Sequence, residues 1–216
     1  MKVSKAILVK KTILISLSTI LISIGVTLFL QSSLGSDPIT IFVDGLRHSL
    51  ALTMGDAAML NNGVTLILAA IFARKYIHLG TVIGALAIGP LMNFFAPWIQ
   101  LIFSPAPGLP SRILMIVLGQ LIICFGVALN LSVKFGFGTT DALLVRLCER
   151  YRLKYRSLKL LADLAYTLGG ILLGGIFGAG SVMAVLTGGP IIAYFMETAA
   201  KSMVDLFRIP DISLPA

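Results

Sequence analysis

Six long apolar stretches constrain this chain more than any other feature of its sequence. A hydrocarbon core of about 30 Å needs about 20 predominantly apolar residues in a helix. The stretches near this length are Thr12–Leu30, Ala57–Ala73, Ile77–Phe103, Ile113–Val133, Leu160–Gly180 and Ser181–Ala200. Only 12% of the 216 residues are charged, too few to cover the surface of a soluble domain. We therefore expect an all-α polytopic membrane protein with six transmembrane helices.

The distribution of basic residues predicts how these helices cross the membrane. The net charge of +8 is by itself also typical of proteins that bind nucleic acid. If the N terminus lies in the cytoplasm, however, all but two of the 17 Lys and Arg residues fall on the cytoplasmic side, and the exceptions are Arg47 and Arg112. Basic residues collect on that side of membrane proteins. We therefore expect a multi-pass protein with both termini and Lys154 in the cytoplasm, Ala106 outside, membrane lipid as a partner and no nucleic-acid partner.

The chain repeats its own pattern of glycines after about one hundred residues. At spacings of 101 or 100 residues, the matched pairs include Gly25/Gly126, Gly35/Gly136, Gly80/Gly180, Gly89/Gly189 and Pro90/Pro190. These matches indicate a tandem duplication within a single membrane domain, 1–216, with repeat 1 at about 12–103 and repeat 2 at about 113–200. Since each repeat holds three predicted spans, the two copies enter the membrane from opposite sides. Such inverted-topology repeats are typical of secondary transporters, whose binding site lies between the halves.

Each repeat carries a polar segment between its first and second spans, Leu34–Leu52 in repeat 1 and Phe135–Lys154 in repeat 2. In repeat 1, Ser36-Asp37-Pro38 predicts the start of a helix, because Ser and Asp cap free backbone N–H groups and Pro suits the first helical position. In repeat 2, Thr139-Thr140-Asp141 is expected to supply the cap. Apolar residues recur at helical spacing after both signals. We therefore expect one short amphipathic or re-entrant helix in each repeat.

The glycine-broken turns before these two helices are candidates for a binding site. Glycine lets a backbone approach a ligand closely, and the unpaired N–H groups at a helix start favour an anionic group. In this interpretation the substrate-binding residues are Gly35, Ser36 and Asp37 of the first turn and Gly138, Thr139, Thr140 and Asp141 of the second. In the alternative interpretation the two turns only reverse the chain.

Polar residues inside the apolar runs extend this candidate site. Asn62 in the second span and Asp163 in the fifth occupy matching positions of the two repeats, and polar groups within a membrane usually face an interior or a cavity. Asn93, in the third span, is a further candidate for solute binding. Asp163 also lies four residues from Lys159, so these two side chains could instead form an ion pair near the interface.

Glycine-proline pairs interrupt the third and sixth spans at Gly89-Pro90 and Gly189-Pro190. Proline removes a helical hydrogen bond, and glycine permits a bend or a close contact. The pairs therefore indicate either gating hinges or close-packed helix crossings.

The sequence contains no pattern typical of catalysis or of a cofactor site. The two histidines, His48 and His78, are predicted on opposite sides of the membrane, and no phosphate-binding loop, zinc-binding His pair or nucleophile elbow is present. We therefore expect no enzyme activity, no cofactor and no metal.

The glycine, Asp-Pro and Gly-Thr landmarks, taken with six spans, resemble those of the YczE/YyaS/YitT-type bacterial integral membrane proteins. The matching positions, from about Gly25 to Phe195, include Gly35, Asp37-Pro38, Gly80-Thr81, Gly89-Pro90, Gly136 to Asp141 and Gly189-Pro190. The resemblance implies a location in the bacterial cytoplasmic (inner) membrane. It implies nothing about the substrate, because no settled biochemical activity comes with that family.

The inverted repeat and the sparse polar groups favour a small membrane transporter or exporter of a small polar or charged solute, with its site between the repeats. One alternative is a ligand-binding membrane subunit of a larger transport complex. Another is a non-transporting accessory protein whose basic loop, Arg146 to Lys159, docks a partner or anionic lipid. The sequence is also compatible with a homo-oligomer.

Overall fold

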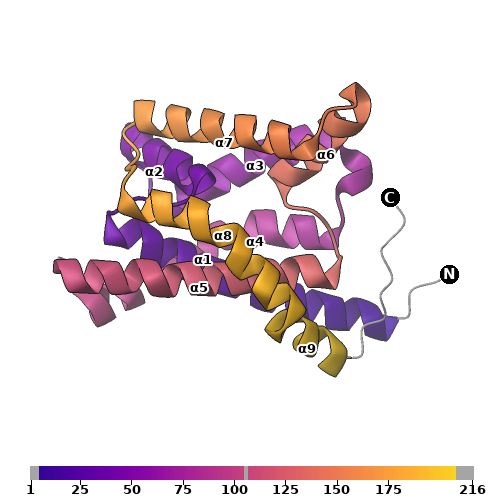
Figure 1. Ribbon diagram of the computed structural model, residues 1–216, viewed down its shortest axis with the longest axis horizontal. Helices are drawn as coiled ribbons and strands as arrows, with labels where there is room; N and C mark the ends of the chain where they lie inside the picture. The colour runs from indigo at the N-terminus through magenta and orange to yellow at the C-terminus, as the bar shows by residue number, and fades with distance from the viewer. Residues whose placement is uncertain (1–4, 105–106, 208–216) are drawn as a thin grey trace.

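The computed structural model describes residues 5–104 and 107–207, so that Ala106 lies outside the described residues. The regular structure in these two segments is helical, and neither contains a β-strand. The bounds of the helices, labelled in Figure 1, are Lys5–Ser32 (α1), Pro38–Leu50 (α2), Met54–Phe72 (α3), Leu79–Phe103 (α4), Leu109–Val133 (α5), Thr139–Tyr151 (α6), Tyr155–Leu172 (α7), Ala179–Glu197 (α8) and Ala199–Leu206 (α9). A short 3-10 helix, Arg74–Tyr76, joins α3 to α4.

Five stretches of the described residues are long and apolar enough to cross a membrane, namely α1, α3, α4, α5 and the segment Ala179–Leu206 that contains α8 and α9. The expectation of an all-helical membrane protein is thereby confirmed. The predicted span Leu160–Gly180 is not among the five. Its helix, α7, ends at Leu172 because the chain turns at Gly174, whose φ of +92° suits glycine. The charged residues of α7 are Arg156, Lys159 and Asp163.

The helices α1 and α5 pack against each other along their length. They run antiparallel, since Gly25 of α1 faces Gly119 of α5 while Gly126 of α5 faces Ser18 of α1. A Cβ atom at Gly25 would lie 2.8 Å from the carbonyl oxygen of Gly119, and a Cβ atom at Gly126 would lie 3.1 Å from that of Ser18. The matched glycines therefore let the two backbones meet. The buried apolar residues of this pair include Leu14, Ile15, Ala128 and Leu129.

The first glycine-broken turn is bound to a helix of the second half of the chain. The backbone N–H of Gly180, at the start of α8, donates to the carbonyl oxygen of Leu34 at 2.8 Å. The backbone N–H of Ser36 donates to the Ser181 hydroxyl at 3.0 Å. Gly35 between them has a φ of +92°, which glycine adopts without strain. These bonds fix the turn against α8.

The second turn is bound to the first half at matching positions. The backbone N–H of Gly80, at the start of α4, donates to the carbonyl oxygen of Phe135 at 3.2 Å. The Thr81 hydroxyl donates to the carbonyl oxygen of Phe137 at 2.7 Å. Gly136 has a φ of +134°. Each half of the chain therefore holds the turn of the other half.

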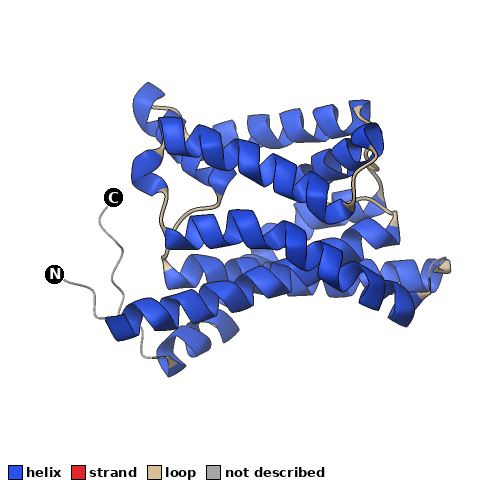
Figure 2. Cartoon of the chain, turned by 180° about the vertical axis from the view of Figure 1, so that it is seen from behind, coloured by secondary structure: helices blue, strands red, loops and turns tan. Residues whose placement is uncertain are grey.

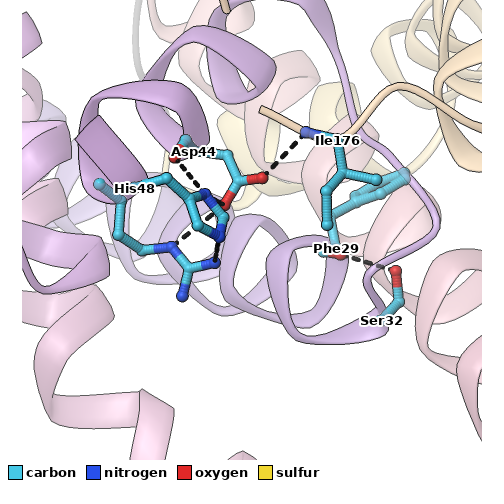
Figure 3. Close-up of polar contacts among 6 residues, drawn as sticks. Phe29, Ser32, Asp44, His48 and Ile176 are labelled. Atoms are coloured by element: carbon cyan, nitrogen blue, oxygen red, sulfur yellow. Dashed lines mark hydrogen bonds and ion pairs between the residues drawn. The ribbon is translucent and has the colours of Figure 1, made fainter. Parts of the chain in front are cut away.

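The short helices α2 and α6 also pack against the opposite half of the chain. Helix α2 packs on α7, and α6 packs on α3. Figure 1 shows α2 and α6 toward opposite ends of the molecule, and Figure 2 shows loops gathered at both ends. The buried carboxylate of Asp44 in α2 accepts from Arg47 Nε at 3.1 Å and from the backbone N–H of Ile176 at 3.1 Å (Figure 3). The side chain of His48 contacts the carbonyl oxygen of Asp44 at 2.9 Å. This cluster ties α2 to the connection between α7 and α8.

On the other side, α6 is tied to the connection between α3 and α4. Arg146 Nε donates to the carbonyl oxygen of Phe72 at 3.2 Å, and Lys75 Nζ lies 2.7 Å from Glu149 Oε2. The hydrogen bond with Glu149 raises the pKa of Lys75, and the same bond lowers the pKa of Glu149. Since both side chains are exposed, the pair contributes little stability.

Candidate functional site

A partly open cavity of about 300 Å³ lies between the two halves of the chain, lined by residues of α1 to α5 and of the start of α6. Apolar side chains cover part of its wall, among them Val26, Ile88 and Val127. The polar residues that line it are Asp37, Thr40, Asn62, Thr81, Asn130, Thr139, Thr140 and Asp141. Among the described residues, no Lys, Arg or His lines this cavity. The cavity therefore combines an apolar wall with two carboxylates.

The start of α2 brings Asp37 to the cavity. Its Oδ1 accepts from the backbone N–H of Thr40 at 3.3 Å, and its Oδ2 accepts from the Thr40 hydroxyl at 2.5 Å. Pro38 occupies the first turn of the helix. The predicted cap of α2 is thereby confirmed, and it leaves a carboxylate at the cavity wall.

The start of α6 reaches the same cavity by a different arrangement. The prediction that Thr139, Thr140 and Asp141 cap this helix was wrong, because the N-cap position is Gly138 and no side-chain bond caps it. Thr139 is instead the first helical residue, and its hydroxyl lies 2.8 Å from that of Thr65 in α3. Thr139 therefore contacts α3, and the side chains of Thr140 and Asp141 contact α7.

Two tyrosines of α7 meet the start of α6. The Tyr155 hydroxyl donates to Asp141 Oδ1 at 2.9 Å, and the Thr140 hydroxyl lies 3.4 Å from that of Tyr166. The ring of Tyr166 also packs edge-on against Phe42 of α2, with ring centroids 5.4 Å apart. Tyr166 therefore contacts both α2 and α6, whose starts line the same cavity.

Lys159 of α7 lies between two carboxylates beside the cavity. Its Nζ is 3.0 Å from Asp163 Oδ1 and 3.9 Å from Asp141 Oδ1. Within the described segments, no ion pair joins Asp37 to a basic residue. One ammonium group is thus shared by two carboxylates, while a third, that of Asp37, lines the cavity without an ion-pair partner among the described residues.

Among the predicted site residues, the structure brings Asp37, Asn62 and the segment 138–141 to one cavity. Asp163 does not line this cavity and forms the ion pair with Lys159 that its spacing allowed. Gly35 and Ser36 also lie outside the lining, in the turn that is bound to α8.

Asn93 serves the contact between α3 and α4. Its Oδ1 accepts from the backbone N–H of Gly55 at 2.9 Å, and its Nδ2 donates to Asp56 Oδ1 at 3.1 Å. It is absent from the cavity lining. The amide of Asn93 therefore connects two helices of the first half.

The two glycine-proline pairs have different surroundings. A Cβ atom at Gly89 would lie 2.4 Å from the carbonyl oxygen of Gly55, so that α4 and α3 touch through their backbones. Around Gly189, in contrast, a Cβ atom would meet nothing within 4 Å. Pro90 and Pro190 both lie within continuous helices, α4 and α8. The first pair thus occupies a close crossing and the second pair does not.

Sequence reasoning missed several residues at the cavity. Asn130 of α5 lines it and donates through Nδ2 to Ser18 Oγ at 3.2 Å. Thr40 and Thr81 line it as well. The signal for Asn130 was available, because an amide in an otherwise apolar helix is costly without a partner. The tyrosines of α7 gave no such signal, since Tyr is common in membrane helices near the interface.

The chain matches other proteins of unestablished activity over most of its length. The model of a family of unknown function (DUF6198) matches residues 9–197. An uncharacterised protein of Haemophilus influenzae is 28% identical over 193 residues, which cover 88% of this chain and 86% of that protein. The uncharacterised protein YyaS of Bacillus subtilis is 27% identical over 194 residues, covering 88% of this chain and 94% of YyaS.

The uncharacterised membrane protein YczE of Bacillus subtilis is 24% identical over 171 residues, covering 78% of each chain. No solved structure matches the chain. The resemblance predicted from the glycine landmarks is confirmed by YyaS and YczE. Because the family model covers the chain from residue 9, within α1, to the end of α8, this protein belongs to the family of unknown function DUF6198.

Proposed function

We propose that the chain is a small transporter of the bacterial inner membrane, built from two inverted three-span repeats with a solute site between them. The proposal requires α7 to be the sixth span. Its 18 residues extend about 27 Å at 1.5 Å per residue, close to the thickness of the hydrocarbon core. Its large exposed apolar side chains are Leu160, Leu161, Leu164, Leu168, Ile171 and Leu172. These suit contact with lipid, while Lys159 and Asp163 pair with each other.

Backbone features at matching positions support the inverted repeat. Left-handed residues occur at Ser33 and Lys134, before the two turns, and again at Ala51 and Arg152, after the two short helices. The helices α1 and α5 run antiparallel, and α2 and α6 lie toward opposite ends (Figure 1). With six spans both termini lie on the same side of the membrane, which the distribution of basic residues assigns to the cytoplasm, and the two repeats have opposite orientations.

The observation that carries the proposed function is a cavity to which both halves contribute polar side chains. Polar groups buried in a membrane need water, a ligand or each other. Here Asp37 from the first repeat and Asp141 from the second line one cavity together with Asn62 and Asn130. A solute bound there contacts both repeats, so a movement of one repeat against the other changes the side from which the solute is reached.

The proposal is tested by filling the cavity. A Cβ atom at Gly84 meets nothing within 4 Å, and this residue lines the cavity, so Gly84→Phe is expected to occupy the solute site without a backbone clash. Gly63 of α3 also has open space around its Cβ position but does not line the cavity. Gly63→Phe is therefore the matched control.

Purified protein in proteoliposomes is supplied with a ¹³C-labelled extract of small water-soluble cell molecules, and the solutes that enter are identified by mass spectrometry. We expect at least one solute to enter in the presence of the wild-type protein and of Gly63→Phe, and its uptake to fall at least tenfold in Gly84→Phe. Transport through this cavity is ruled out if Gly84→Phe takes up solutes like the wild type, or if wild-type vesicles take up no more than protein-free vesicles.

A further inference from the structure

The charges around the cavity indicate which kind of solute it binds. The side chains concerned are three carboxylates, Asp37, Asp141 and Asp163, and one ammonium group, Lys159. The starts of α2 and α6 each add about half a positive charge. Even with these two contributions the group retains about one negative charge. An uncompensated charge is costly in a membrane interior, so the arrangement lacks one positive charge.

The missing charge belongs in the cavity itself. Asp163 does not line the cavity, and its negative charge is paired with Lys159 Nζ at 3.0 Å. Asp141 is farther from Lys159, at 3.9 Å, and its other donor is the neutral Tyr155 hydroxyl at 2.9 Å. Among the described residues, Asp37 accepts only from the hydroxyl and the backbone N–H of Thr40. The two carboxylates that line the cavity are therefore the less neutralised ones, and no basic side chain of the described residues shares the lining with them.

The apolar residues of the lining indicate that the solute carries a carbon skeleton in addition to its charged group. Much of the lining consists of branched and long apolar side chains of α1, α4 and α5, which include Val26, Ile88, Met92, Ile123, Val127 and Leu131. A fully hydrated metal ion gains nothing from such a wall, whereas a carbon skeleton buries apolar surface against it. The volume of about 300 Å³ is at the lower end of the range of small-molecule sites.

We propose that the cavity binds a small organic cation, with a protonated or quaternary nitrogen at Asp37 and Asp141 and an apolar body against α1, α4 and α5. This inference rests on the proposed function, whose solute class it specifies. It differs from the sequence-based expectation that the helix starts favour an anion, because Asp37 and Asp141 already occupy those starts.

The test uses three probes that share one ring and differ in the charge of the head group: benzylammonium, benzyl alcohol and benzoate. The thermal unfolding temperature of the purified full-length protein is measured with each probe at equal concentration and ionic strength. A ligand that binds the folded state raises this temperature by mass action. We expect benzylammonium to raise it and the neutral and anionic probes to leave it unchanged.

Variants locate the effect in the cavity. Asn caps a helix as well as Asp does, so Asp37→Asn removes the charge and retains the start of α2. Asp141→Asn is the second variant. Each is expected to weaken the apparent affinity for benzylammonium about 10- to 100-fold, since one charge-assisted contact is lost. Asp205→Asn, on the exposed surface of α9, is expected to retain the wild-type affinity.

The result distinguishes this inference from the proposed function. If benzoate stabilises the protein and Gly84→Phe abolishes that effect, the solute cavity stands and the cationic class is wrong. If benzylammonium has no effect, or acts equally on Asp37→Asn, Asp141→Asn and the wild type, a bound proton supplies the missing charge and the inference is overturned. Whether the protein transports is decided separately by the uptake measurement with Gly84→Phe.

Discussion

Gly89→Ala is expected to destabilise the protein severely, whereas Gly189→Ala, at the matching position of the second half, is expected to leave its stability unchanged or slightly raised. The new methyl group at position 89 would lie 2.4 Å from the carbonyl oxygen of Gly55 and 3.1 Å from Met59 Cβ. The backbone of α3 would have to move away. Overpacking of this kind costs about 1–3 kcal/mol, and more where the obstacle is backbone.

At position 189 the methyl group meets nothing within 4 Å, and Ala is favoured over Gly in a helix by about 1 kcal/mol. The measurement is the thermal unfolding temperature of the two purified variants beside the wild type. Equal unfolding temperatures for the two variants would show that α3 and α4 do not meet through Gly55 and Gly89. The Gly89-Pro90 pair would then be free to act as a hinge.

Lys159→Met is expected to lower the free energy of unfolding by about 2 kcal/mol, since it leaves Asp141 and Asp163 without their ammonium partner. Breaking a fully buried pair costs about 3–5 kcal/mol. The smaller value is expected here because 32% of the Lys159 side chain is exposed. The double variant Lys159→Met/Asp163→Asn, which restores the charge balance, is expected to recover most of the loss.

The matched control is Lys75→Met, which breaks the exposed pair with Glu149 and is expected to leave the unfolding temperature nearly unchanged. Thermal unfolding of these three variants and of Asp163→Asn alone, measured beside the wild type, completes the double-mutant cycle. If Asp163→Asn fails to rescue Lys159→Met, the two side chains do not act as a pair, and Asp163 becomes free for a role in solute binding.

The apolar runs and the glycines predicted the positions of most helices and of both turns. Periodicity and run length depend on local chemistry, which is why the helices appear where Thr12–Leu30 and Ile113–Val133 predicted them. The two turns were also readable, because Gly35 and Gly136 take φ values that other residues avoid. The end of α7 was misjudged, since the apolar run Leu160–Gly180 continues past a turn that its glycines allow.

The exchange of contacts between the halves could not be predicted. That Thr81 bonds to Phe137 and Ser36 to Ser181 depends on tertiary packing between distant segments, and a sequence pattern carries no such distances. The candidate site shows the same limit. Asn62 and Asn93 are both amides in apolar helices, and only the packing shows that Asn62 lines the cavity while Asn93 joins α3 to α4.

The central claim, a cavity that opens to each side in turn, is tested most directly by labelling Asn62→Cys. In a background in which Cys124 and Cys148 are replaced by Ala, a small membrane-impermeant thiol reagent is applied to intact cells and to inside-out vesicles. Leu164→Cys, at an exposed position of α7 that faces lipid if α7 is the sixth span as proposed, is the control that is expected to react from neither side. The account predicts that Asn62→Cys reacts in both preparations. Reaction from one side alone would contradict alternating access and leave a cavity with a single fixed entrance.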